Sequence, residues 1–352
     1  MEKGTTNKRQ DYILKLLEGG VGLSIAEIIR ELQKGFGQVT KITVNRDLVY
    51  LTRAGLIESH GKARATRYKI SIHYNLIRNI DVEDYFKNGP DKRRIQESFN
   101  FSIFDLLEDI FSDHEQKYLE DLNQEFHNNV RRLSPTILKK ELERLIIEFS
   151  WKSSQIEGNT YTLLETEALI LRQKEAEGHN KKEATMILNH KKALDFILNN
   201  KKDFQDITAG KIEYIHSLIV DGLQVPKNIR KSLVGITGTR YRPLDNQWQI
   251  KEALEDLCKL VNGEENIFAK SMILSLMIAY IQPFEDGNKR TARMLGNAIL
   301  LAWGSCPLSY RSASEEEYKK AVLLFYEINN LNYYKRLFIN QFEFAVKNYF
   351  LS

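Results

Sequence analysis

The sequence predicts a mainly α-helical protein with a separate module at its N-terminal end, and three observations support this prediction. Only 6 prolines and 19 glycines occur among 352 residues, so regular structure is rarely interrupted. Leu, Ile, Lys and Glu recur at helical spacing along most of the chain. A chain of this length also exceeds one typical domain. We therefore expect a module at residues 1–75, a helical linker region at residues 76–135 and a helical domain at residues 136–352.

Positive charge is concentrated at the N-terminal end. Residues 1–70 contain 13 Lys and Arg against 7 Asp and Glu, a balance of +6, whereas the whole chain carries only +4. Such an asymmetry indicates that this end alone is suited to contact a polyanion.

The composition favours a globular, cytoplasmic protein over several other classes. Hydrophobic residues make up 42% of the chain, which is enough for ordinary cores. No apolar run reaches the roughly 18 residues of a membrane-spanning helix, and no secretory signal precedes the first module. The two cysteines, Cys258 and Cys306, lack the spacing of a zinc site or a disulfide framework. We expect no membrane partner.

The N-terminal module reads as three short helices followed by two β-prone segments. A helix is expected at residues 8–18, and Ser24 with Glu27 forms a capping-box pattern that begins a second helix at residues 24–32. A third helix follows near Lys41. The β-prone segments flank a Gly-Lys-Ala-Arg turn at residues 61–64. This order of elements resembles a winged helix-turn-helix domain.

That resemblance implies a DNA-binding surface. The third helix would enter the major groove and the turn would lie along the phosphate backbone. The residues placed to contact DNA are Lys41, Thr43, Asn45 and Arg46 on the helix, with Lys62, Arg64 and Arg67 on the wing that the β-prone segments and their turn form. Winged helices also serve as protein-docking modules, so this alternative stays open.

The remaining chain is read as helices with one β-like interruption. Residues 88–94 indicate a break between modules, and residues 99–111 predict an amphipathic helix. Another helix is expected from about residue 136 to near Ser153. Thr162 is placed to cap the next helix. Residues 232–244, with a Thr-Gly-Thr turn, predict an isolated β-hairpin. Further helices are expected at about residues 180–199, 208–221, 248–262, 267–281, 288–303, 314–329 and 333–349.

The stretch YIQPFEDGNKRTAR at residues 280–293 carries the strongest chemical signal. Pro283 ends one helix and another begins after Gly287, so the loop presents free backbone N–H groups at a helix N-terminus, which is a site for anions. Arg290 and Arg293 lie on one helical face, where they could grip phosphate oxygens. Asp286 could hold a magnesium ion. The alternative is a glycine turn followed by a solvated basic helix start.

The same stretch resembles the core motif of the Fic family, His-x-Phe-x-Asp/Glu-Gly-Asn-Gly/Lys-Arg-x-x-Arg. The matching positions are Phe284, Asp286, Gly287, Asn288, Lys289, Arg290 and Arg293. Residues 153–158, SSQIEG, also resemble the family's inhibitory motif Ser/Thr-x-x-x-Glu-Gly/Asn. The 232–244 segment falls where the family has its target-docking flap. The resemblance covers roughly residues 140–345 and implies a Fic-type helical domain with a small hairpin flap.

The resemblance implies transfer of AMP from ATP to a Ser, Thr or Tyr hydroxyl of a target protein, with release of pyrophosphate. Asp286 would bind magnesium; Gly287, Asn288, Lys289, Arg290 and Arg293 would hold the phosphates; and Ile236, Thr237, Gly238 and Thr239 would dock the target. In the inhibitory motif of Ser153, Glu157 and Gly158, the glutamate would pair with Arg293 and keep the resting protein inactive. A homodimer is left open.

Gln282 departs from the motif, because the family has its catalytic histidine at this position. An amide cannot take a proton at neutral pH, and losing a general base costs about 10²–10⁴-fold in rate. We therefore expect weak, altered or absent transfer, unless His190 or His216, more readily read as core histidines, serves as the base. Lys289 resembles Doc-type members, which phosphorylate targets, so phosphate transfer is also open.

Two alternatives follow from these features. One is a DNA-binding regulator whose Fic domain senses nucleotide or docks a partner without catalysis. The other, ranked last, uses Glu157 to activate a water molecule that removes AMP from a modified protein.

Overall fold

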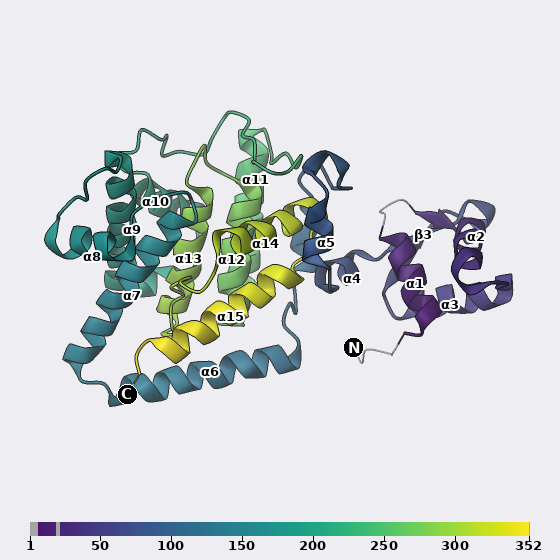
Figure 1. Ribbon diagram of the computed structural model, residues 1–352, viewed down its shortest axis with the longest axis horizontal. Helices are drawn as coiled ribbons and strands as arrows, with labels where there is room; N and C mark the ends of the chain where they lie inside the picture. Colours follow the sequence, from purple (N-terminus) through teal and green to yellow (C-terminus); the bar gives the residue numbers. More distant parts are fainter. Residues whose placement is uncertain (1–5, 19–21, 352) are drawn as a thin grey trace. The chain divides into compact units, whose positions relative to one another are not determined.

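The chain divides into two compact units. The computed structural model describes residues 6–18 and 22–351 (Figure 1). The first unit runs to Ile95 and includes Ile328–Asn332, and the second comprises Gln96–Glu327 and the chain from Tyr333 onward.

Three helices and a small antiparallel sheet form the first part of the N-terminal unit. The helices are α1 (Lys8–Leu17), α2 (Ile25–Phe36) and α3 (Lys41–Arg53), and the strands are β1 (Leu23–Ser24), β2 (Ile57–His60) and β3 (Arg67–Ile70) in the order β1-β3-β2. The predicted capping box is confirmed, since Ser24 and Glu27 exchange hydrogen bonds at the start of α2. Apolar residues one helical turn apart fill the core, among them Ile13, Leu17, Ile28, Leu32, Val44, Leu48 and Leu51.

Short helices complete this unit. They are the 3-10 turns η1 (Ala63–Ala65) and η2 (Pro90–Lys92) and the helices α4 (Ile72–Ile77) and α5 (Val82–Lys87). The returning segment Ile328–Asn332 is fixed to α4 by backbone and side-chain hydrogen bonds. Leu331 N donates to Leu76 O at 2.7 Å, and Asn330 Nδ2 donates to Asn75 O at 2.7 Å.

The second unit is almost entirely helical. Its elements are η3 (Phe101–Leu106), α6 (Asp113–Arg132), α7 (Pro135–Gln155), α8 (Leu163–Arg172), α9 (Lys181–Asn199), η4 (Lys201–Phe204), α10 (Ala209–Ile219), α11 (Gln247–Gly263), α12 (Ile267–Ile281), α13 (Asn288–Ala302), α14 (Glu315–Ile328) and α15 (Asn332–Asn348). The seven helices expected between residues 180 and 349 are confirmed as α9–α15 with ends within two residues. Thr162 caps α8 as predicted.

A pair of buried helices, α12 and α13, forms the centre of this unit. Nearly every residue of both is buried, and Figure 1 shows them side by side with α7, α9 and α10 on one flank. Gly296 permits their close approach, because a Cβ there would lie 3.3 Å from Ser271 O. Ser271 Oγ donates to Gly296 O at 2.9 Å. The loop between these two helices is therefore held on a rigid support.

Two predicted elements are wrong. Residues 99–111 form only the 3-10 turn η3, because tertiary contacts fix this segment: Phe99 stacks on Tyr280 with ring centroids 4.7 Å apart, and Asn100 N donates to the Tyr280 hydroxyl. Residues 232–244 contain a turn but no β-ladder, and Arg242 makes only an isolated parallel bridge to Ser98. The sheet of the described chain lies instead in the N-terminal unit. No helix in the described ranges has both the length and the apolar character needed to span a bilayer.

Candidate functional site

The loop between α12 and α13 has the shape expected from its sequence. Helix α12 ends at Ile281, and α13 begins at Asn288 directly after Gly287. Gly287 has φ of +81°, and a Cβ at this position would lie 3.0 Å from Val220 Cγ1, so glycine alone fits without strain. No side chain caps the helix here. The first backbone N–H groups of α13 are therefore available to an anion.

Gln282 sits at the C-terminal end of α12 with its side-chain amide fixed. Its backbone is left-handed, with φ of 51°, and the residue is 8% exposed. Nε2 donates to Ala279 O at 2.6 Å, and Oε1 accepts from Asn288 Nδ2 at 3.0 Å. Asn288 is itself oriented, because its Oδ1 accepts from Phe284 N at 2.9 Å. The amide at the position of the expected histidine is thus part of the loop's own hydrogen-bond network.

Arg293 joins α13 to the end of α7. This fully buried side chain donates from Nη2 to Glu157 Oε1 at 3.0 Å and to Ser153 O at 2.8 Å, and from Nε to Ser153 Oγ at 2.9 Å. Lys289 Nζ donates to the other oxygen of Glu157 at 3.2 Å. Ser153 lies in the last turn of α7 and Glu157 lies in the turn that follows this helix, where Gly158 has φ of 90°.

Glu157 is ionised in this arrangement. Burial raises the pKa of its carboxyl group, but the charges of Arg293 and Lys289 outweigh burial and hold the pKa below its ordinary value. The Glu157 carboxylate therefore pairs with two of the three cationic side chains that the sequence analysis expected to bind phosphate.

Arg290, the third cation, is buried behind the loop. It is 2% exposed, and its Nη2 donates at 3.0 Å to Asp286, whose side chain is 66% exposed. Its Nη1 is buried and has no hydrogen-bond partner among the described residues. Within the same described ranges, His, Cys, Asp and Glu form no group of three or more that could hold a metal ion.

The two histidines considered as bases are structural neighbours of the site. His190 Nε2 accepts from Ser153 Oγ at 2.9 Å and Nδ1 donates to Met186 O at 2.8 Å. His216 Nε2 donates to Asp286 O at 3.0 Å, and its ring stacks on Phe284 with centroids 3.6 Å apart. Burial lowers the pKa of His190 to about 3 and that of His216 to about 4, so both rings are neutral.

Arg230 is a site neighbour that the sequence did not reveal. It is 2% exposed, and its guanidinium donates to three backbone carbonyls: Gln282 O at 2.6 Å, Ser232 O at 2.8 Å, and Leu244 O. Its backbone N donates to Pro283 O at 3.0 Å. The Arg230 side chain therefore holds the two ends of the 232–244 segment together and anchors them to the α12–α13 loop.

The predicted docking residues lie along the segment that Arg230 closes. Thr237 and Gly238 are exposed at the turn, whereas Ile236 and Thr239 are partly buried. Thr239 Oγ1 accepts from Tyr241 N at 3.1 Å. No signal in the sequence marks Arg230 itself, because its partner Gln282 lies 52 positions away.

The candidate DNA-contacting residues lie in the N-terminal unit. Lys41, Asn45 and Arg46 are exposed on α3, and Thr43 is partly buried near the start of this helix. Lys62 is exposed, and the side chain of Arg64 lies outside the described residues. Arg67 is exposed, donates to Gly22 O at 2.7 Å and pairs with Glu27 at 3.4 Å.

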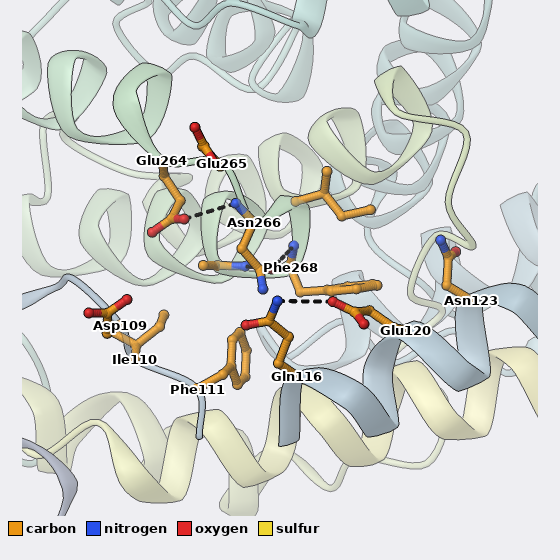
Figure 2. Close-up of a pocket in the computed structure, with 12 residues that line it drawn as sticks. Asp109, Ile110, Phe111, Gln116, Glu120, Asn123, Glu264, Glu265, Asn266 and Phe268 are labelled. Carbon is orange, nitrogen blue, oxygen red and sulfur yellow. Dashed lines mark hydrogen bonds between the residues drawn. The ribbon is translucent and has the colours of Figure 1, made fainter. Parts of the chain in front are cut away.

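A cavity of about 440 Å³ lies away from the α12–α13 loop (Figure 2). It opens where residues 109–111 and α6 meet the start of α12, and none of the predicted site residues lines it. Two hydrogen bonds join its lining residues: the Gln116 side chain donates to Glu120, and the backbone N of Asn266 donates to the Glu264 side chain. The lining residues are Asp109, Ile110, Phe111, Gln116, Glu120, Asn123, Glu264, Glu265, Asn266, Ile267, Phe268 and Ala269.

Comparison with known sequences agrees with the motif. Residues 206–300 match the model of the Fic/DOC family. A Caenorhabditis elegans protein described as protein adenylyltransferase fic-1 is 24% identical over 206 residues, covering 57% of this chain and 40% of that protein. A probable protein adenylyltransferase of Aquifex aeolicus is 30% identical over 118 residues, covering 33% of this chain and 36% of that protein. The chain thus spans less than half the length of these relatives.

Solved structures share the fold. Fic-1 from C. elegans superposes with a TM-score of 0.59 at 20% identity, covering 66% of this chain and 71% of that one. A Fic domain containing signaling protein from Bacteroides thetaiotaomicron superposes with a TM-score of 0.56 at 19% identity, covering 65% of this chain and 94% of that one. The helical arrangement around α12 and α13 is therefore Fic-like.

Proposed function

We propose that this chain, whose residues 206–300 match the model of the Fic/DOC family, is an ATP-binding transferase held inactive by its own Glu157. The single observation that carries the proposal is the 3.0 Å pair between Glu157 and Arg293. It places a carboxylate on a buried cation beside the uncapped start of α13, where a phosphate chain would otherwise bind.

ATP binding is supported by the donors that converge on this position. The free N–H groups at Gly287–Asn288 and the cations Lys289, Arg290 and Arg293 suit a triphosphate. Arg290 Nη1, buried and without a partner in the described chain, fits an anion that supplies one. Binding of the terminal phosphates would displace Glu157, because both compete for the same guanidinium and repel each other.

The residues also fit a magnesium ion that arrives with the nucleotide. Asp286 is exposed and offers one carboxylate, and its Oδ2 is already held by Arg290 at 3.0 Å. Magnesium is commonly bound by one or two carboxylates together with substrate phosphates. The ion would supply charge neutralisation of the phosphates, while Asp286 would hold it.

Gln282 limits the rate of AMP transfer in this proposal. Its amide is fixed by Ala279 and Asn288 and cannot remove a proton from a hydroxyl of a target protein. AMP transfer to Ser, Thr or Tyr would therefore be slower by about 10²–10⁴-fold than with a histidine base. The target would dock along residues 236–239 at the turn of the 232–244 segment.

Labelled ATP tests this proposal. The wild-type chain, Glu157→Gly, Gln282→His and the double variant that combines Glu157→Gly with Gln282→His would each be incubated with α-labelled or γ-labelled ATP in a cell extract. We expect protein labelling from α-labelled ATP to rise with Glu157→Gly and to rise further when Gln282→His is added. Protein labelling from γ-labelled ATP but not from α-labelled ATP would instead indicate phosphate transfer, the alternative suggested by the resemblance of Lys289 to Doc-type members. Calorimetry that finds no ATP binding to Glu157→Gly would refute the proposal.

A second candidate is a DNA-binding regulator whose Fic domain senses ATP. The exposed cations Lys41 and Arg46 on α3 favour it, since they lie on a helix of the basic N-terminal unit. Nonspecific affinity for duplex DNA should then fall steeply as salt rises. Replacing both cations with alanine should reduce the salt slope by about 2, whereas an unchanged slope would remove this candidate.

A further inference from the structure

Helix α3 keeps its own acidic residue away from its exposed face. That residue, Asp47, is 4% exposed. Its carboxylate is paired with Arg9 at 2.5 Å and accepts from Gln10 Nε2 at 3.1 Å. The apolar residues of α3 that fill the core of the N-terminal unit are buried with it. The opposite face of α3 therefore presents no negative charge of its own.

The exposed face of α3 combines positive charge with apolar side chains. Lys41, Arg46 and Arg53 are exposed on it. Ile42 and Val49 are 67% and 42% exposed, and their spacing of seven residues places them on one side of the helix. The centre of a protein-docking surface is usually depleted of charge, whereas here cations adjoin the apolar residues. This combination favours a partner that is rich in phosphate and also offers small apolar groups.

Ile42 is exposed at the start of α3, whereas its neighbour Thr43 is part of the helix cap. Thr40 caps α3, and its hydroxyl accepts from Thr43 N at 3.3 Å. The hydroxyl of Thr43 is hydrogen-bonded to that of Thr40 at 2.9 Å, and Thr43 is partly buried. In a helix-turn-helix, the start of the second helix is the part that contacts base edges. Ile42 is therefore placed closer to a bound duplex than the threonine beside it.

Asn45 lies three residues beyond Ile42 and is exposed on the same face. Residues at this spacing in a helix have Cβ atoms about 5–6 Å apart, so the two side chains can reach one base pair or two neighbouring pairs. In the major groove, adenine presents an acceptor and a donor that a side-chain amide can bond together, and the paired thymine presents a methyl group. Asn45 has the amide, and Ile42 has the apolar surface, that these two groups require.

We propose, on the basis of the DNA-binding candidate function, that α3 reads an A·T base pair in the major groove of duplex DNA. Asn45 hydrogen-bonds to the adenine, and Ile42 packs against the thymine methyl group. The cations of the same face contact phosphates, which carry no sequence information. Ile42 and Asn45 are thus the residues that determine base preference, while Lys41 and Arg46 supply affinity.

Alternating copolymer duplexes test this inference with the intact chain. The probes are duplexes of poly(dA-dT), of poly(dA-dU), which lacks only the thymine methyl groups, and of poly(dG-dC). Dissociation constants are measured by filter binding at one salt concentration, because affinity for DNA depends on salt. The variants are Ile42→Ala and Asn45→Ala. Ile77→Ala, which removes another exposed isoleucine of the N-terminal unit, is the matched control.

We expect the wild type to bind poly(dA-dT) at least about fivefold more tightly than poly(dG-dC). It should also bind poly(dA-dT) about fourfold more tightly than poly(dA-dU), as the burial of one methyl group implies. Ile42→Ala should lose the preference for thymine over uracil, and Asn45→Ala should lose most of the preference over poly(dG-dC). Ile77→Ala should keep both preferences.

Two results would overturn the inference. One is equal binding of poly(dA-dT) and either of the other duplexes by the wild type. The other is a pair of preferences that survive both Ile42→Ala and Asn45→Ala. Binding of no duplex at all would instead refute the DNA-binding candidate function itself.

Discussion

The carboxylate of Glu157, in the turn just after α7, lies 3.0 Å from Nη2 of Arg293 on α13. The two residues are 136 positions apart in the sequence. The same nitrogen also donates to Ser153 O at 2.8 Å, so the guanidinium holds both the side chain and the backbone of one helical turn. The last turn of α7 is thereby fixed against the start of α13.

Removing the Glu157 carboxylate should strengthen ATP binding. Glu157→Gln keeps the shape of the side chain but no longer competes as an anion for Arg293. We expect the ATP dissociation constant to fall by about tenfold, which corresponds to about 1.4 kcal/mol. Isothermal calorimetry measures it. Glu167→Gln, which removes an exposed acid of α8, is the matched control and should leave the constant unchanged; equal effects of the two variants would contradict the prediction.

Gly287 should tolerate no side chain. Alanine would have to adopt φ of +81° and place its Cβ 3.0 Å from Val220 Cγ1. We expect Gly287→Ala to lower the free energy of unfolding by about 1–3 kcal/mol and to weaken ATP binding, as urea unfolding and calorimetry would show. Gly263→Ala is the control, because a Cβ there meets open space. Similar losses in both variants would argue against a special role for Gly287.

Acid should destabilise the protein through its buried histidines. Burial lowers the pKa of His216 to about 4, below the ordinary value of about 6.5. The unfolded chain therefore binds the proton more tightly, and stability is lost as pH falls from about 6.5 to about 4. The shift corresponds to roughly 3 kcal/mol.

A variant isolates the contribution of His216. His216→Gln keeps an N–H donor for the Asp286 carbonyl but does not titrate. The urea midpoint of this variant should depend less on pH than that of the wild type, while His114→Gln, at an exposed position, should follow the wild type. The prediction fails if His216→Gln shows the full pH dependence.

Arg230 should control the mobility of the 232–244 segment. Arg230→Lys keeps the charge but cannot reach Gln282, Ser232 and Leu244 together. We expect backbone amides of this segment to exchange hydrogen at least about tenfold faster, measured by mass spectrometry. Arg242→Lys, an exposed change within the segment, should have little effect. Unchanged exchange in Arg230→Lys would show that other contacts hold the segment.

The features of the structure that depend on residues close together in the sequence were predictable. Pro283 and Gly287 bracket the loop because a proline ends a helix and a glycine accepts positive φ, and the structure has the two helix ends there. The caps at Ser24 and Thr162 follow from residues three positions apart.

The parts that depend on distant partners were not predictable. Arg230 contacts Gln282 across 52 positions, and His216 contacts Asp286 across 70, and no periodicity connects such pairs. The expected hairpin at residues 232–244 failed for a related reason. Arg230 takes the carbonyls of Ser232 and Leu244, which are the groups that a pair of strands at the base would share.

The placement of Glu157 and Arg293 on one chain has a consequence for cellular control. An inhibitor supplied as a separate molecule is weakened by dilution, but a tethered carboxylate competes at a fixed effective concentration. Under the proposed function, the fraction of released protein would depend on the concentration of free nucleotide and not on how much protein is made. A cell would then raise or lower the amount of this protein without changing the ATP concentration that releases it.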